Sequence, residues 1–219
     1  MESIDITVDL ETCSLSVNAA VMSIGAIAWN RDVNKEMVIE EFEAKIDLRS
    51  SFIEGFDFDR STAKWWSEQS KEAKAALLST NDNRLCTVEE AVKNLCQWIT
   101  DVKEENNAED VYLWSQGTDF DIAILRNICR KYDITLPVKY SNFRDHRTFN
   151  SEIKRLYREQ LDKFYKKENI TRTYTDNESF GNGDEETKGV EHDALYDCKY
   201  SILITRSLMS QFLGIEYVE

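Results

Sequence analysis

The chain is poor in residues that interrupt or cross-link a polypeptide. Its 219 residues include one proline, seven glycines and two histidines. The five cysteines are odd in number and none belongs to a CxxC pair, which argues against a disulfide framework or a zinc ribbon. Neither a signal peptide nor an apolar run of the roughly 20 residues that a membrane span requires is present. We therefore expect a soluble cytoplasmic protein that does not associate with membranes.

Positive charge is also scarce. Lys and Arg number 27 against 41 Asp and Glu, for a net charge of −14, whereas proteins that neutralise many phosphates usually carry a basic patch. Bound divalent cations could supply local positive charge instead. The segment 151–167 is the exception to the acidic background, and it is read either as the solvated face of an amphipathic helix or as a rail for a nucleic-acid strand. Its basic residues are Lys154, Arg155, Arg158, Lys163, Lys166 and Lys167.

The length and the 42% content of hydrophobic residues fit a single domain over residues 1–219 with a full core. Periodicity predicts an α/β order in which strands come first and helices then alternate with strands. The predicted strands are 4–10, 21–30, 37–47, 111–115 and 143–146. The predicted helices are 62–78, 87–104, 120–132, 148–167 and 193–213.

Two carboxylates, Asp9 and Glu11, interrupt the apolar pattern of the first predicted strand. Residues two apart on a strand point to the same side, so these two side chains lie together. One interpretation is the solvated side of a half-buried strand. A buried carboxylate, however, needs a partner or a metal, and paired carboxylates suit a hard cation.

Two later segments carry further candidate site residues. Asp121 lies in GTDFDIAIL, and His192 and Asp197 lie in EHDALYDC. Taken alone, Asp121 could be a first-turn acid that favours the helix dipole, and His192 could be a capping or surface residue. On one continuous helix His192 and Asp197 would point about 140° apart. We therefore expect His192 at or before the helix start and Asp197 inside the helix.

Together, and in this order, the three segments resemble the DEDD family of 3′–5′ exonucleases, in the branch with HxAxxD in its last motif. Residues 62–74 and 143–148 are similar to the T-x-x-W-W-x-x-Q and R-D-x-R-T stretches of the subfamily that includes exonuclease A of the T-even phages and related exoribonuclease-like domains. The resemblance covers nearly the whole chain.

The resemblance implies a ribonuclease H-like fold, with a central mixed β-sheet flanked by helices. It implies a metal-dependent 3′–5′ exonuclease that releases nucleoside 5′-monophosphates from the 3′ end of single-stranded DNA, with two Mg²⁺ or Mn²⁺ ions. In this interpretation Asp9, Glu11 and Asp197 hold the ion that carries the attacking water. Asp9 and Asp121 hold the other ion, and His192 is the general base.

The tryptophan pair in 62–74 suggests a substrate-facing side. Helical spacing puts Trp65 and Gln69 on the nucleic-acid side, where an aromatic ring can stack on a base, and Trp66 in the core. The alternative is that both tryptophans pack the domain. The residues that flank the acids, Leu10, Thr12 and Phe120, are expected to line the pocket for the terminal nucleotide.

Three other functions remain open on the sequence. An exoribonuclease would recognise the 2′-hydroxyl. A catalytically silent nucleic-acid-binding domain is expected to have lost an acid or the histidine, yet all five are present. A structural interaction module gives no reason for acids within the first strand. The expected partner is single-stranded nucleic acid, DNA in preference to RNA, and a homodimer is compatible with the sequence.

Overall fold

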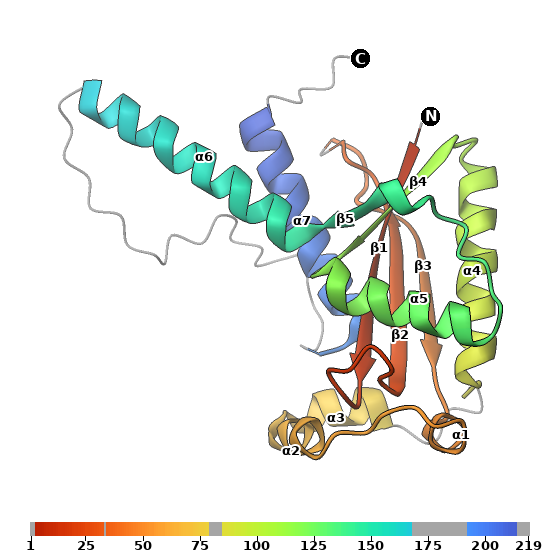
Figure 1. Ribbon diagram of the computed structural model, residues 1–219. Coiled ribbons are helices and arrows are strands. Elements are labelled where there is room, and N and C mark those ends of the chain that lie inside the picture. Colours follow the sequence, from red (N-terminus) through yellow and green to blue (C-terminus); the bar gives the residue numbers. More distant parts are fainter. Residues whose placement is uncertain (1–2, 33, 79–84, 168–191, 214–219) are drawn as a thin grey trace.

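A five-stranded mixed sheet organises the chain (Figure 1). The computed structural model describes residues 3–32, 34–78, 85–167 and 192–213. Along the sheet the strand order is β3-β2-β1-β4-β5, with β2 antiparallel to β1 and β3, and with β4 parallel to both β1 and β5. The strands are β1 (Ser3–Thr12), β2 (Val21–Trp29), β3 (Val38–Lys45), β4 (Asp110–Ser115) and β5 (Phe143–Asp145).

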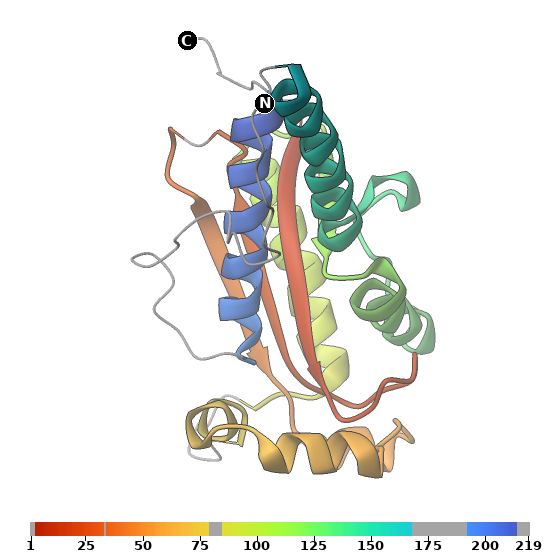
Figure 2. The same ribbon diagram turned by 90° about the vertical axis from the view of Figure 1, so that its left-hand side faces the viewer.

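Helices flank the sheet and cross one of its ends. The first group is α1 (Leu48–Ile53), α2 (Arg60–Glu68), α3 (Lys71–Leu78) and α4 (Val88–Glu105). The second group is the π-helical turn η1 (Thr118–Ile122), α5 (Ala123–Lys131), the 3₁₀ turn η2 (Tyr140–Asn142), α6 (His146–Lys167) and α7 (Ala194–Leu213). Helix α6 projects away from the sheet (Figure 1), whereas α2 and α3 lie across the end of the sheet at which β1 ends (Figure 2).

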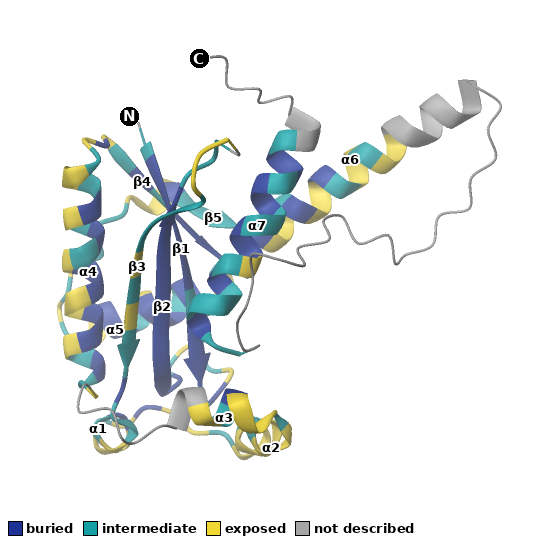
Figure 3. Ribbon diagram, turned by 180° about the vertical axis from the view of Figure 1, so that it is seen from behind, coloured by how far each residue is buried: buried dark blue, intermediate teal, exposed yellow. Residues whose placement is uncertain are grey.

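Strand β1 lies between two hydrophobic clusters, so both of its faces are covered (Figure 3). Its even-numbered residues, from Ile4 to Leu10, pack with α4 and α5. The opposite side of the sheet packs against α7, through a cluster that contains Trp29, Trp114 and Ile202. From Asp5 onward, the odd-numbered residues of β1, on the α7 side, are Asp5, Thr7, Asp9 and Glu11.

The predicted mixed sheet with flanking helices is confirmed, and the bounds of most elements agree within two residues. The prediction of a single helix over 62–78 is wrong, because this segment forms two helices, α2 and α3. Helix α2 ends because Gln69 adopts an extended backbone with ψ 166°. Helix α3 then begins where the Ser70 hydroxyl accepts a hydrogen bond (3.0 Å) from the Ala73 N–H. Helix α1 and the π-helical turn were not predicted.

Candidate active site

The first pair of acids lies on a polar face of β1 that another element covers. Asp9 is partly exposed and Glu11 is only 8% exposed. The sequence suggested that the apolar pattern of β1 breaks at the acids, but the structure shows no such break. The pattern alternates from Ile4 onward, and the alternate residues form one polar row beneath α7. A β-bulge between Glu11 and Thr12 then ends the regular pairing with β2, and such bulges redirect side chains at the ends of strands.

Asp121 reaches the same end of β1 from the turn η1. Strand β4 pairs with β1 only as far as Thr7 and Trp114, and η1 follows β4 directly. The backbone N–H of Leu10 faces the Asp121 carboxylate and lowers its pKa, and Asp121 is only 3% exposed. The π-helical turn thus places a buried carboxylate against β1, although the sequence predicted an ordinary first helical turn.

Helix α7 supplies the last acid because it approaches the sheet very closely. Gly25 pairs with Asp9 in the β1–β2 ladder, and a Cβ at position 25 would lie only 2.6 Å from the backbone carbon of Ala194. The Cys198 thiol lies 3.5 Å from the Gly25 carbonyl oxygen. Position 25 of β2 therefore requires glycine, because the start of α7 packs directly against it. This close approach lets Asp197, in the first turn of α7, face the β1 acids.

These elements bring oxygen ligands together. One carboxylate oxygen from each of Asp9, Glu11 and Asp197 lies within 4.8 Å of the other two. Asp121 lies close enough to Asp9 to be the largest charge acting on it. Donors that are all carboxylate oxygens suit a hard divalent cation such as Mg²⁺ or Mn²⁺. Four of the five predicted groups, the acids, come from β1, η1 and α7 and form one cluster, named here the carboxylate cluster.

The pKa values show how unfavourable this cluster is without a cation. Burial raises the pKa of Asp9 well above its ordinary value, and the neighbouring carboxylates raise it further. Burial followed by the charge of Asp197 raises the pKa of Glu11 to about 8. Burial raises the pKa of Asp121 to about 7, against the opposing effects of the backbone hydrogen bonds and of Arg147. A bound cation would relieve this repulsion and favour the ionised forms.

His192 lies before α7, as the sequence predicted. It precedes Ala194, the first residue of the helix, and its backbone is left-handed with φ 65°. Its imidazole contacts two rings of α2. The ring centroids lie 4.8 Å from Trp65 and 6.1 Å from Trp66. The histidine is therefore outside the helix that carries Asp197, at the junction between α7 and α2.

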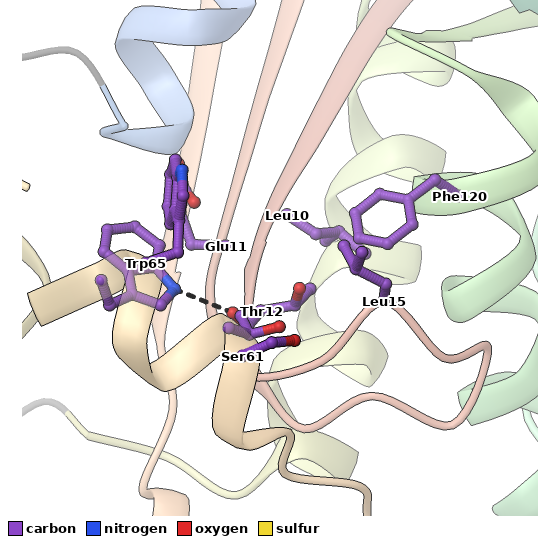
Figure 4. Close-up of a pocket in the computed structure, with 9 residues that line it drawn as sticks. Leu10, Glu11, Thr12, Leu15, Ser61, Trp65 and Phe120 are labelled. Carbon is purple, nitrogen blue, oxygen red and sulfur yellow. Dashed lines mark hydrogen bonds between the residues drawn. The ribbon is translucent and has the colours of Figure 1, made fainter. Parts of the chain in front are cut away.

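A pocket of about 460 Å³ opens beside the carboxylate cluster, within the usual range of about 300–1,000 Å³ for small-molecule sites. Leu10, Leu15 and Phe120 lie on one side of it and Trp65 on the other (Figure 4). The full lining is Leu10, Glu11, Thr12, Leu15, Ser61, Thr62, Trp65, Trp66 and Phe120. The structure thus brings four of the five predicted substrate-binding residues, Leu10, Thr12, Trp65 and Phe120, around one cavity.

Two predictions for the tryptophan helix need correction. Trp66 is half-buried and lines the pocket, where its indole N–H donates to the Thr12 carbonyl oxygen (3.0 Å), so its assignment to the core is wrong. Gln69 does not line the pocket. It ends α2 with an extended backbone, and its side-chain amide donates to the Trp65 carbonyl oxygen (3.0 Å). The helix ends too early to present Gln69 beside Trp65.

The basic helix is partly neutralised by its own acids. Arg155 forms ion pairs with Glu152 (3.0 Å) and Glu159 (2.8 Å). Lys154 is half-buried, while Arg155 and Arg158 are exposed. The side chains of Lys163, Lys166 and Lys167 lie outside the described part of the chain. The reading of this helix as a substrate rail stays a prediction.

Sequence reasoning missed three residues that shape the site. Gly25 could have been noticed as a glycine inside an apolar strand, a common sign of close backbone approach. Asp193 caps α7, because its carboxylate accepts a hydrogen bond from the Tyr196 N–H (3.1 Å). Its negative charge also raises the pKa values of Asp9 and Glu11. Arg147, in the stretch FRDHRT, donates to the Gln116 carbonyl oxygen, and its charge lowers the pKa of Asp121.

The family relationship agrees with this geometry. A model of the Rv2179c-like 3′–5′ exoribonuclease domain matches residues 4–209. The chain belongs to this family. The Rv2179c-like chain is 27% identical to the exodeoxyribonuclease of Enterobacteria phage T4 over 235 aligned residues, which cover 97% of this chain and 92% of the phage protein.

Solved structures place the fold of the Rv2179c-like chain. The nuclease domain of 3′hExo, a DEDDh family member bound to rAMP, matches with a TM-score of 0.55 and 13% identity over 95% of this chain and 93% of that domain. A zinc-bound complex of Escherichia coli exonuclease I with single-stranded DNA matches with a TM-score of 0.53 and 10% identity. That match covers 96% of this chain but only 41% of exonuclease I, so this chain spans less than half of that protein.

The Rv2179c-like chain is therefore a 3′–5′ exonuclease, as its motifs predicted, and its ribonuclease H-like fold is similar to that of the DEDDh family member 3′hExo. The carboxylate cluster offers oxygen ligands that could hold a divalent cation. Within the described residues, no helix is both long enough and apolar enough to span a membrane.

Proposed function

We propose that residues 1–219 form a single exonuclease domain that removes nucleoside 5′-monophosphates from the 3′ end of single-stranded DNA. The observation that carries this proposal is the meeting of acids from β1, η1 and α7 in one cluster, of which Glu11 also lines a pocket of about 460 Å³. The preference for DNA is supported by the similarity to the phage T4 exodeoxyribonuclease over nearly the full length of both proteins.

The carboxylate cluster would hold two Mg²⁺ or Mn²⁺ ions. Asp9, Glu11 and Asp197 would hold one of them through the oxygens that lie within 4.8 Å of one another, and Asp9 and Asp121 would share the other. When bound, such ions supply a positive charge for the phosphate, a more acidic water and a stabilised leaving oxygen. The burial and the neighbouring negative charges that raise the pKa values of Glu11 and Asp121 disfavour their ionised forms, and a bound cation would offset both effects.

His192 would accept the proton of the attacking water on an imidazole nitrogen. Its place before α7 leaves all four acids available as ligands, so it can act beside the cluster and not within it. A general base of this kind contributes roughly 10²–10⁴-fold to turnover.

The pocket would bind the terminal nucleoside. Leu10 and Phe120 offer an apolar wall, and the Trp65 ring faces them across the cavity (Figure 4). Thr12 lies at the end of β1 next to Glu11 and would contact the sugar. This arrangement orients the scissile phosphate toward the acids and keeps the bases in an apolar setting.

A second substrate class, RNA, is supported by the description of the family as exoribonucleases and by the rAMP-bound 3′hExo domain. The proposal is tested with matched DNA and RNA single strands, labelled at the 3′ or the 5′ end, in Mg²⁺ or Mn²⁺. We expect 3′ label to be released first as a mononucleotide, and DNA to be degraded faster. Faster cleavage of RNA would move the assignment to an exoribonuclease, and initial release of 5′ label would refute the polarity.

Variants separate catalysis from simple binding. Asp9→Asn and Asp197→Asn should abolish cleavage while the protein stays folded, because each removes a cluster ligand. Asp110→Asn is the matched control, since Asp110 pairs with Lys139 (2.5 Å) and belongs to no part of the cluster. If Asp197→Asn cleaves DNA at the wild-type rate over a range of metal concentrations, the metal assignment is wrong.

A further inference from the structure

Three aromatic rings from two distant parts of the chain meet at the edge of the pocket. Besides its contacts with His192, Trp65 lies 4.9 Å from Trp66 between ring centroids. The three interplanar angles are 73°, 80° and 82°, so each pair is in an edge-to-face arrangement, which aromatic rings prefer over face-to-face stacking. We name Trp65, Trp66 and His192 the three-ring cluster.

Core packing does not explain why these tryptophans are present. Helix α2 contains no buried residue, and the Trp65 side chain is 42% exposed. Trp66 is held in place by its hydrogen bond to the Thr12 carbonyl oxygen, which follows Glu11 directly on β1. Trp66 in turn supports Trp65, and both support the imidazole. A chain of contacts therefore runs from the strand that carries the acids to His192.

His192 needs such support because of where it stands. It precedes α7, so no helical turn restrains its side chain, and its left-handed backbone (φ 65°) is uncommon for a residue other than glycine. A side chain at such a junction has several rotamers available. The rings of Trp65 and Trp66 lie nearly perpendicular to the imidazole and sterically restrict the rotamers of His192.

We propose that Trp65 and Trp66 are positioning residues that hold the His192 imidazole in its working orientation. This inference rests on the proposed function, in which His192 accepts the proton of the attacking water. Removal of Trp65 leaves the imidazole present but spreads it over several rotamers, and the rate falls with the fraction that remains correctly oriented. By this account Trp65 affects kcat through His192, whereas its place in the pocket affects KM through the bound nucleoside.

A double-mutant cycle separates these two roles. Trp65→Leu is measured by steady-state cleavage over a range of single-stranded DNA concentrations, which gives kcat and KM separately, once with His192 present and once in His192→Ala. With His192 present, kcat should fall about 3- to 10-fold, as expected for loss of one aromatic contact. In His192→Ala the same substitution should leave kcat unchanged. Equal losses in the two backgrounds, or a loss confined to KM, would overturn the inference in favour of base stacking.

Two further variants serve as controls. Trp65→Phe keeps a ring beside His192 and should retain most of kcat. Phe58→Leu removes an aromatic side chain of similar exposure (44%) whose ring centroid lies 6.0 Å from that of Phe52. This variant should cleave DNA at the wild-type rate. If Trp65→Phe is as slow as Trp65→Leu, the ring contact is not what positions His192.

An NMR measurement tests the contact without relying on activity. The chain has only two histidines, and His146 stacks on Trp114 at 4.9 Å, far from α2 in the sequence. Trp65→Leu should shift the ring-proton resonances of His192 toward those of a free histidine and leave His146 unchanged. Unmoved His192 resonances would overturn the inference. Equal cleavage by wild type and His192→Ala would instead refute the proposed role of His192 in catalysis.

Discussion

Glu11→Gln should stabilise the metal-free protein at alkaline pH, although Glu11 belongs to the candidate active site. The substitution keeps the size of the side chain and removes its charge. Burial and the nearby carboxylates raise the pKa of Glu11 from 4.5 to about 8. Because the folded-state pKa is the higher one, the contribution of Glu11 to stability is complete below pH 4.5 and is lost as the pH rises through about 8.

The size of the effect follows from this shift. One pKa unit corresponds to about 1.4 kcal/mol, so the raised pKa represents a cost of at most about 5 kcal/mol above pH 8. The neighbouring acids share protons with Glu11, and a buried glutamine also loses hydration, so we expect a net gain of about 2–4 kcal/mol. In a domain of this size that gain corresponds to an increase in Tm of about 4–16 °C.

The assay is unfolding by urea or heat in EDTA, from pH 4.5 to pH 9. The gain in the free energy of unfolding should be near zero at pH 4.5 and largest at pH 9, and saturating Mg²⁺ should reduce or reverse it, because the wild type binds the cation more tightly. Glu43→Gln, at an exposed position on β3, is the matched control and should change stability by less than about 0.5 kcal/mol throughout. A gain independent of pH, or a loss at pH 9, would refute the electrostatic account of the cluster.

Three further predictions test how the rest of the chain supports the site. Gly25→Ala should destabilise the protein by more than about 2 kcal/mol and weaken Mn²⁺ binding in calorimetry, because the new Cβ would lie 2.6 Å from the Ala194 backbone; unchanged affinity would mean that α7 can retreat without moving Asp197. Arg147→Gln should raise the pKa of Asp121 further and so weaken Mn²⁺ binding more at pH 6.5 than at pH 9, and an equal loss at both pH values would exclude this cause. Reversal of three basic residues of α6 should flatten the salt dependence of binding to long single strands by about 0.7 per lost phosphate contact and leave dinucleotide cleavage unchanged; loss on both substrates would point to damage at the site, and no loss would leave a solvated helix face. The residues to reverse are Lys154, Arg155 and Arg158.

The sequence alone was sufficient to predict which acids lie together and most of the strands and helices. Asp9 and Glu11 lie two apart on a strand, so strand geometry puts them on one face wherever that strand lies. The helical phase likewise separates His192 from Asp197 and requires the histidine before α7. These conclusions depend on local backbone geometry, which nearby residues largely determine. The family resemblance then supplied the order of the motifs and the ribonuclease H-like fold.

Contacts between distant residues determined the rest. Helical periodicity over 62–78 revealed neither the break between α2 and α3 nor the hydrogen bond that holds Trp66 at Thr12. Gly25 became important only when Ala194 was placed against it. The pKa of Glu11 depends on burial and on Asp197, which follows it by 186 positions in the chain. Tertiary structure decided these features because steric contact and electrostatic interaction depend on distance in space, and the local sequence does not contain that distance.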